Sequence, residues 1–320
     1  MKTLSQLTDF YYKELYPQLQ DLDKRRKEIR FKIVLTSAFT LLIFAIILAF
    51  ITKAYGFSFD LLFIGGALVS ILFPLLYKFY TKEYTKTFKN RIITPLIQEL
   101  SQRLSYTTSA YIPESVFMQS EIFQRPDRYR GNDYIKGIID GVSLQFSDIH
   151  AEKKVKDSKG RTSWKTLFKG LYIVSDFHKE FHGHTMVLPD SAEKLFGNFL
   201  GQFLQSKNFT KNQLVKMDNS AFEKEFVVYA TDQIEARYIL SHTLMQKILE
   251  LRNKTQHPLS IAFVANKVHI AIHYNKDLLE PTLFRSLLEY KTAMEYIKTL
   301  VVSVGIIHEL KLNEKLWSKK

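Results

Sequence analysis

Long uncharged apolar runs occur only in the first third of the chain. Residues 33–51, IVLTSAFTLLIFAIILAFI, contain no charged residue. At about 1.5 Å of rise per residue, a helix of this length matches a bilayer core of about 30 Å. After a short connection, residues 57–77 form a second run, which is uncharged from Leu61 onward. This pattern predicts a two-helix transmembrane hairpin with spans at 33–51 and 57–77.

Two other interpretations of these runs are disfavoured. A helix buried in a soluble core rarely stays uncharged over such a length, and here two runs follow each other. A cleaved signal peptide is also disfavoured, because about thirty residues precede the first run and no small-residue cleavage pattern ends it.

Basic residues flank the hairpin asymmetrically. Six Lys and Arg residues lie between positions 24 and 32 and five between 78 and 91, whereas only Lys53 lies between the runs. Since basic residues favour the cytoplasmic side, we expect both termini in the cytoplasm. These residues also serve as a plain topology signal, but those nearest the membrane are candidates for contact with anionic lipid: Lys24, Arg25, Arg26, Lys27 and Lys82.

Helical periodicity continues on both sides of the hairpin. Leucine and tyrosine residues recur every three or four positions from Leu4 to Leu22, and apolar residues recur every four positions from Phe88 to Leu104. We therefore predict an amphipathic helix within residues 1–32 and a juxtamembrane helix within 78–106, packed as an antiparallel cytoplasmic stalk. Pro17 and Pro95 are expected to kink these helices.

The remaining residues, 107–320, show short apolar runs separated by turn signals. Apolar residues alternate with polar ones from Val142 to Phe146, which predicts a half-buried strand, and a returning strand is expected from Trp164. Further strand candidates are HTMVLP, FEKEFVVYA, LSIAFVA and VHIAIHY, and two helices are expected from Asp232 and from Thr282. Strands first and helices later predict an α+β cytoplasmic head with an antiparallel sheet.

Composition narrows the possible functions. The 320 residues include no cysteine, which excludes disulfides, zinc–thiolate sites and cysteine nucleophiles. Residues 1–91 carry 14 basic and 7 acidic residues, so +7 of the net charge of +13 lies in the membrane-proximal part. The aromatic residues fall mainly at apolar-patterned positions and no nucleic-acid-binding module is recognisable, so we expect no nucleic acid partner. No phosphate-binding loop or other cofactor motif is present.

One segment, FHGHTMVLPD at 181–190, suggests metal chemistry. Asp176, His178, His182 and His184 bring together imidazole and carboxylate groups, the ligands that zinc accepts when cysteine is absent. If residues 182–188 form a strand, His182 and His184 share one face. The competing interpretation, polar residues on a solvent-exposed strand face, is favoured because no further spaced ligand set supports a metal.

The histidines of VHIAIHY have a similar interpretation. His269 and His273 alternate with Val268, Ile270 and Ile272. The alternation predicts that the two histidines lie on the solvent-exposed face of a strand.

Three motifs carry a family resemblance: YRGNDYIKGIIDG, FKGLYIVSDFHKEFHGHTMVLPD and FEKEFVVYATDQIEARYILSHTLM. In this order after a membrane hairpin, they resemble a family of bacterial membrane proteins catalogued as a domain of unknown function, numbered thirty-one thirty-seven. The resemblance implies a protein of the bacterial cytoplasmic (inner) membrane and brings no activity, cofactor or catalytic residue. The matching positions are mostly of structural type: Gly170, Asp176, Phe181, Gly183, Val187, Pro189, Asp190, Phe222, Glu223, Phe226, Tyr229, Asp232, Glu235, Ala236, Arg237 and Leu240.

The sequence therefore favours a non-enzymatic, membrane-anchored adaptor or scaffold whose head or stalk binds a protein partner or a second copy. One alternative is a membrane-tethered metal-dependent hydrolase that uses His178, His182 and His184. Another is a head that binds lipid headgroups.

Overall fold

The computed structural model divides the chain into two units. It describes residues 2–56, 59–156, 159–177, 182–190, 213–274, 276–310 and 312. The head unit consists of residues 1–3, 97–278 and 298–320, and the stalk unit of residues 4–96 and 279–297. Residues 279–297, which were expected in the head, thus group with the membrane-proximal helices.

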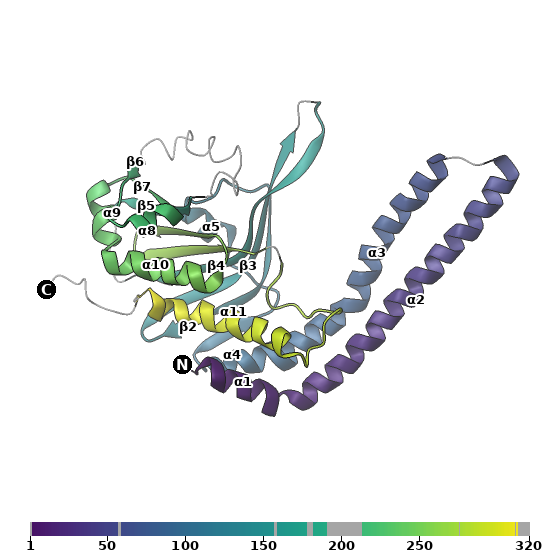
Figure 1. The fold of residues 1–320 in the computed structure, drawn as a ribbon, viewed down its shortest axis with the longest axis horizontal. Helices are drawn as coiled ribbons and strands as arrows, with labels where there is room; N and C mark the ends of the chain where they lie inside the picture. The colour runs from purple at the N-terminus through teal and green to yellow at the C-terminus, as the bar shows by residue number, and fades with distance from the viewer. Residues whose placement is uncertain are drawn as a thin grey trace. The chain divides into compact units, whose positions relative to one another are not determined.

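One antiparallel sheet forms the head unit (Figure 1). In the described part of the chain it has nine strands in the order β1-β2-β3-β4-β9-β8-β5-β7-β6. The antiparallel sheet of the predicted α+β head is confirmed. The strands are β1 Leu104–Thr107, β2 Arg128–Ile139, β3 Val142–Lys156, β4 Thr162–Asp176, β5 His184–Pro189, β6 Gln213–Val215, β7 Phe226–Ala230, β8 Leu259–Val264 and β9 Lys267–His273.

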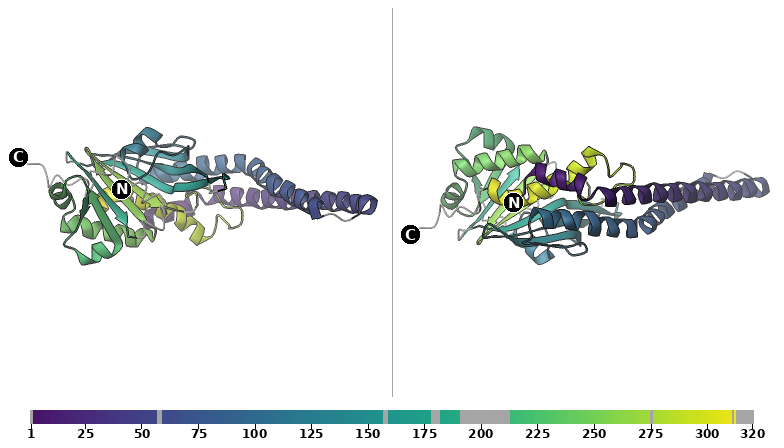
Figure 2. Two further views of the ribbon diagram at one scale, coloured as in Figure 1. Left: turned by 90° about the horizontal axis from the view of Figure 1, so that it is seen from above. Right: turned by 90° about the horizontal axis from the view of Figure 1, so that it is seen from below.

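Both faces of the central strands are covered. On one face, the Phe117 ring of helix α5 (Glu114–Gln119) packs against Phe123, Phe168 and Tyr172. On the other, helix α10 (His242–Thr255) and the part of α11 (Tyr290–Glu309) that belongs to the head unit lie along the sheet (Figures 1 and 2). Every residue of β5 is therefore buried, as are the middle residues of β8 and β9.

This double cover corrects the expectation for the histidines of β9. His269 is 1% exposed, because its face of the strand points into the core beside helix α5 rather than into solvent. His273, at the end of β9, is half-buried against the rings of Phe123 and Phe168. Alternation of polar and apolar residues indicates one wet face only when a sheet has a single cover.

The helices of the head differ from the sequence expectations in three places. The first residues of the strand candidate FEKEFVVYA, 222–225, instead belong to a helix over 220–225 that is capped by the Asn219 side chain. The helix expected from Asp232 is two helices separated at Leu240, and the last helix begins at Tyr290 rather than near Thr282. The helices are α5 Glu114–Gln119, α8 Ser220–Glu225, α9 Gln233–Ile239, α10 His242–Thr255 and α11 Tyr290–Glu309.

The stalk unit contains α1 (Leu4–Lys13), α2 (Tyr16–Tyr55) and α3 (Phe59–Phe88), followed by a π-helix (Lys89–Ile93) and the start of α4 (Thr94–Leu100), whose residues from 97 onward belong to the head unit. Prolines mark its irregularities. Pro17 lies in the first turn of α2, where no amide donor is needed, so the helix restarts rather than kinks. Before Pro95, the Thr94 amide bonds to the Lys89 carbonyl, five residues back, which makes the π-turn.

The apolar faces predicted for the stalk helices are buried. Leu7, Tyr11, Leu19, Phe88 and Ile92 are all fully buried. The second helix ends at Leu100, however, and the next residues turn into strand β1 instead of extending the helix to Tyr106. The start of α11, residues 290–297, belongs to the stalk unit together with these helices.

Two helices are long and apolar enough to cross a membrane, and they lie within Tyr16–Ala54 and Phe63–Leu100. Only 6% of each apolar window is buried, so these are not core helices of the described structure. Large apolar side chains point outward along both, with Phe50 75% and Phe63 77% exposed. In the part of the chain that the structure describes, this composition and exposure support association with a membrane.

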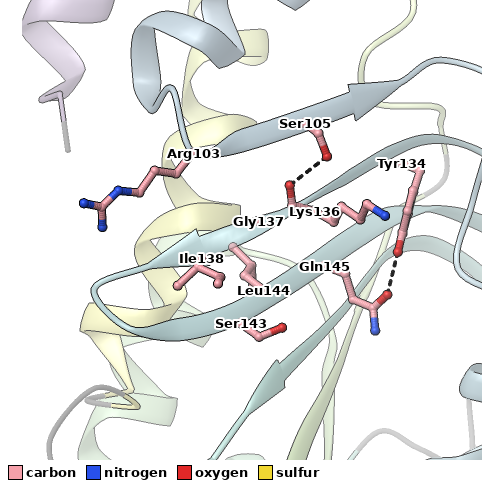
Figure 3. Close-up of a pocket in the computed structure, with 9 residues that line it drawn as sticks. All are labelled: Arg103, Ser105, Tyr134, Lys136, Gly137, Ile138, Ser143, Leu144 and Gln145. Atoms are coloured by element: carbon pink, nitrogen blue, oxygen red, sulfur yellow. Dashed lines mark hydrogen bonds between the residues drawn. The ribbon is translucent and has the colours of Figure 1, made fainter.

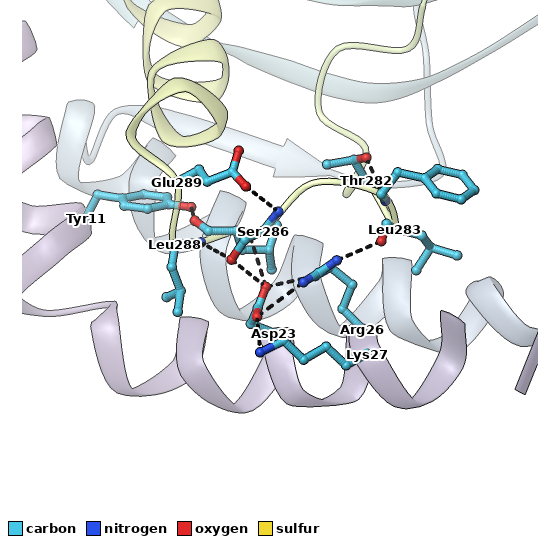
Figure 4. A network of polar contacts seen from close by, with 11 residues as sticks. Tyr11, Asp23, Arg26, Lys27, Thr282, Leu283, Ser286, Leu288 and Glu289 are labelled. Atoms are coloured by element: carbon cyan, nitrogen blue, oxygen red, sulfur yellow. Dashed lines mark hydrogen bonds and ion pairs between the residues drawn. The ribbon is translucent and has the colours of Figure 1, made fainter. Parts of the chain in front are cut away.

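A buried ion pair fixes the base of α2 within the stalk unit (Figure 4). Asp23 and Arg26 are 3% and 5% exposed, and Arg26 Nε donates to Asp23 Oδ1 at 2.8 Å. The same carboxylate oxygen accepts from Ser286 Oγ at 2.8 Å and from the Leu287 amide, while Arg26 Nη1 donates to the Leu283 carbonyl at 2.8 Å. Arg26 therefore has a structural role, whereas Lys24, Arg25, Lys27 and Lys82 are exposed and stay candidates for lipid contact.

Candidate functional site

A groove of about 640 Å³ lies over strands β1 to β3 at one edge of the head sheet (Figure 3). Alternate residues of β2 line it, because Tyr134, Lys136 and Ile138 share the outward face. Cross-strand neighbours complete the floor, since Ser105 pairs with Lys136 and Gln145 pairs with Lys136 from the other side.

Two glycines shape the groove. A Cβ atom on Gly137 would lie 2.1 Å from the Arg103 carbonyl oxygen, so only glycine lets the chain before β1 lie this close to β2. Asp140 and Gly141, with φ of 50° and 80°, form the two-residue turn from β2 to β3. Gly141 thus shapes a turn, whereas Gly137 permits a close backbone approach.

The groove combines positive charge with exposed apolar surface. Arg103 and Lys136 are exposed, and in the described part of the chain neither is paired with a carboxylate. Ile138, which lies on the same strand face as Lys136, is 54% exposed. Burial raises the pKa of Tyr134, and its hydroxyl donates to Gln145 Oε1 at 2.8 Å. This arrangement suits an extended acidic segment with an apolar side chain between its carboxylates.

The sequence analysis missed this groove, although a signal was present. In YIKGI, an isoleucine occupies the same alternating register as Tyr134 and Lys136. The alternation places Tyr134, Lys136 and Ile138 together on one face of the strand, so the sequence already indicated a surface that combines a positive charge with apolar groups.

The residues proposed for metal binding have separate surroundings where they are described. His182 is exposed before β5, His184 is buried in β5, and Asp176 ends β4. His178 lies outside the described residues, so the four-residue set as a whole stays a prediction. Among the described residues, no group of three or more His, Asp or Glu side chains is placed to hold a metal ion.

His184 instead joins β5 to the loop after α5. Its Nε2 donates to the Ser120 carbonyl at 2.9 Å, and its Nδ1 lies 3.2 Å from Glu121 Oε2. The interaction with His184 holds the pKa of Glu121 below its ordinary value. The expectation of a solvent-exposed His184 is wrong, because α5 and its loop cover this face.

A second buried histidine lies nearby. His269 Nδ1 is 3.0 Å from the Tyr172 hydroxyl, which also lies 3.3 Å from the Phe117 carbonyl. Burial lowers the pKa of His269 to about 3 and that of His273 to about 4. Both are therefore neutral at physiological pH, and His269 has a defined hydrogen-bond partner in Tyr172.

The most specific motif residues connect two parts of the head. Asp232 caps helix α9 by accepting from the amides of Ile234 and Glu235. Glu235 does not complete a capping box; its carboxylate accepts from the amides of His182 and Gly183 at 2.9 and 2.7 Å. These residues thus hold the start of β5 against α9.

The comparisons with known proteins agree with these motifs. Residues 166–312 match the family model described as "Protein of unknown function (DUF3137)". This segment of the chain is a DUF3137 domain. The match confirms the family expected from the second and third motifs, while the first motif, at 129–141, lies outside the matched residues. The DUF3137 segment contains β5 and α9 and begins after most of the groove.

Among solved structures, the chain is similar to the crystal structure of the mycobacterial trehalose monomycolate transport factor A, TtfA. The identity is 10%, the TM-score is 0.33, and the alignment covers 63% of this chain and 89% of that chain. At this level of similarity no function is inferred from it. No curated protein matches the chain.

Proposed function

We propose that this protein is a membrane-anchored adaptor whose head binds an acidic segment of a partner protein in the groove over β1 to β3. The observation that carries the proposal is the pair of exposed cations, Arg103 and Lys136, on either side of the exposed Ile138. Charge complementarity selects an acidic partner, and the apolar side chain between the charges supplies a desolvated contact.

The anchoring half of the proposal rests on α2 and α3. Two spans, at 33–51 and 57–77, hold the chain in the cytoplasmic (inner) membrane as a multi-pass protein, with both termini in the cytoplasm. The exposed apolar surface of the helices and the basic residues on both outer sides of the spans support this topology. A reporter fused after Lys320 should be active only in the cytoplasm. Cleavage beyond Tyr84 by external protease in intact cells would contradict it.

A photo-crosslinking experiment tests the groove. A photoreactive amino acid replaces Ile138 in the full-length protein, and the same amino acid replaces Tyr238, which is 51% exposed outside the groove, as a control. We expect one protein to crosslink in stoichiometric amount from position 138 only, through a peptide rich in Asp and Glu. The double variant Arg103→Glu/Lys136→Glu should abolish this product.

A matched variant controls for the change of charge. Lys216→Glu/Lys224→Glu alters two exposed lysines of the head by the same net charge and should leave the crosslink intact. Crosslinks from position 138 to a second copy of the chain would replace the adaptor with a self-assembling scaffold. If positions 138 and 238 gave the same crosslinked products, and charge reversal did not change them, the groove would be ruled out as the binding site.

A further inference from the structure

Strands β3 and β4 extend beyond the rest of the sheet as a two-stranded ribbon (Figure 1). The pairing of β2 with β3 begins at Arg128 and Glu152. From there toward the tip, in the part of the ribbon that the structure describes, residues 153–156 pair with residues 162–165 alone. Such a ribbon exposes both its faces to whatever surrounds the head.

The ribbon is strongly basic. Residues 153–165, KKVKDSKGRTSWK, contain six Lys and Arg residues and one Asp. Lys154, Lys156, Lys159 and Arg161 are exposed. A ribbon that needed charge only for solubility could mix both signs, whereas this one carries a net charge of +5 by the same count.

An aromatic side chain lies among these charges. Trp164 pairs with Lys154 across the ribbon, so the two side chains share a face, and the Trp164 side chain is 41% exposed. The Arg128 guanidinium lies 3.7 Å from the centre of the Trp164 ring. Indole rings favour the interface between water and lipid, and lysine can cover apolar surface while its ammonium group stays in water.

The neighbouring pocket of about 270 Å³ does not provide the same surface. Arg130 is paired with Glu152 at 3.2 Å, and Lys169 with Asp277 at 3.4 Å. These two positive charges are therefore each paired with a carboxylate. On the ribbon, Lys153 pairs with Asp127 at 3.1 Å, and Arg128 lies 3.6 Å from the same Glu152, whereas Lys154 and Lys156 are exposed to solvent. The exposed lysines of the ribbon are thus the basic surface that an anionic ligand can reach.

We infer that the β3–β4 ribbon, with Arg128, binds the anionic headgroups of the membrane that anchors the chain. The inference rests on the anchoring half of the proposed function. A tethered ribbon meets the bilayer at high effective concentration, so individually weak contacts suffice. Each lysine near an anionic surface strengthens such binding by about fivefold. Trp164 enters the interface beside the phosphates.

Quenching of tryptophan fluorescence tests the contact in the full-length protein. The chain has two tryptophans, so Trp317→Phe leaves Trp164 as the reporter. The protein is reconstituted in vesicles that carry a fixed fraction of phosphatidylcholine with brominated acyl chains. The remaining lipid is either phosphatidylcholine or about one third phosphatidylglycerol. We expect at least twofold stronger quenching of Trp164 in the phosphatidylglycerol vesicles, and loss of this difference in about 1 M salt.

Charge reversal in the ribbon tests whether its lysines cause the quenching. Lys154→Glu/Lys156→Glu should remove the added quenching, while Lys216→Glu/Lys224→Glu, with the same change in net charge, should keep it. If the ribbon variant misfolds, the comparison of the two lipid compositions in the protein that keeps Lys154 and Lys156 still tests the inference. Equal quenching in both lipids would overturn the inference, as would tighter binding of the protein to duplex DNA than to anionic vesicles. Displacement of the ribbon by millimolar inorganic phosphate would also overturn it, because a free anion would then be the ligand.

This assay is independent of the groove and of the orientation in cells. A negative quenching result together with a cytoplasmic reporter at Lys320 would remove the ribbon contact alone. A reporter active outside the cytoplasm would instead remove the proposed topology, whatever the quenching shows.

Discussion

Glu235 and Gly183 are joined by a hydrogen bond of 2.7 Å from the Gly183 amide to Glu235 Oε2. The bond connects the two motifs by which the family is recognised, HGHTMVLPD and TDQIEAR. A Cβ atom on residue 183 would lie 2.6 Å from the same carboxylate oxygen and 2.6 Å from Thr231 Oγ1. Glu235 can therefore accept this hydrogen bond only because residue 183 has no side chain. The two motifs thus record a contact between the start of β5 and helix α9.

Replacement of Glu235 should weaken that contact. The variant Glu235→Ala removes a charged acceptor from two backbone amides, and we expect the free energy of unfolding to fall by about 2 kcal/mol. Thermal unfolding of the full-length protein in detergent measures the effect. As a control, Glu225→Ala removes an exposed carboxylate whose nearest cation is 3.9 Å away, so its effect should stay within about 0.5 kcal/mol. Equal losses in both variants would contradict the structural role of Glu235.

The sequence predicted local elements well wherever one face of an element is buried. The regular apolar spacing from Leu7 to Leu22 and from Phe88 to Leu96 identified helical faces that are buried in the stalk unit. The alternation from Val142 to Phe146 identified strand β3. In each case one face of the element is buried, so the spacing of the apolar residues follows the helical or strand repeat.

Other features depend on contacts distant in sequence. The sequence of β9 cannot show that helices cover both sides of the sheet, so His269 was placed in solvent although it is buried beside Tyr172. Likewise, Arg26 was grouped with the basic residues that could contact anionic lipid, but residues 283–287, more than 250 positions later, enclose it together with Asp23. The groove combines β1, β2 and β3, whose register no single-strand pattern specifies.

The ion pair between Asp23 and Arg26 should be sensitive to the loss of one partner. Asp23→Ala leaves the Arg26 guanidinium buried without its carboxylate, which should cost about 3–5 kcal/mol of stability. The double variant Asp23→Leu/Arg26→Leu should be less destabilised than the single one, since no buried charge is left. Asp21→Ala, which removes a half-exposed carboxylate two residues earlier, should cost at most about 1 kcal/mol. Thermal unfolding in detergent compares the three, and equal losses for Asp23→Ala and Asp21→Ala would refute the prediction.

Two glycines should respond oppositely to alanine. Gly170 in β4 has φ of 153°, and a Cβ atom there would lie 2.1 Å from the Ile272 carbonyl oxygen of β9. Gly170→Ala should therefore disturb the pairing of β4 with β9 and lower the free energy of unfolding by at least about 2 kcal/mol. Gly305 lies within helix α11 with nothing within 4 Å of its Cβ position, so Gly305→Ala should raise stability by up to about 1 kcal/mol. Hydrogen exchange of the β9 amides, faster only in Gly170→Ala, would locate the effect, and unchanged exchange would count against it.

The head should lose stability in mild acid because of its buried histidines. Burial lowers the pKa of His269 to about 3 and of His273 to about 4, whereas in the unfolded chain both titrate near about 6.5. At a pH between the folded and the unfolded pKa, the unfolded chain binds protons that the folded head does not. The free energy of unfolding therefore falls as the pH drops from about 6.5, and at pH 5 the loss is about 2 kcal/mol per histidine. Glu121, whose pKa is lowered by His184, adds to the loss of stability only at lower pH, near the ordinary range of a carboxyl group.

Variants of the histidines test this pH dependence. His269→Gln should flatten the dependence of the melting temperature on pH between about 7.5 and 5, while His182→Gln, at an exposed position, should leave it unchanged. A pH dependence that persists in full in His269→Gln/His273→Gln would show that other groups cause it.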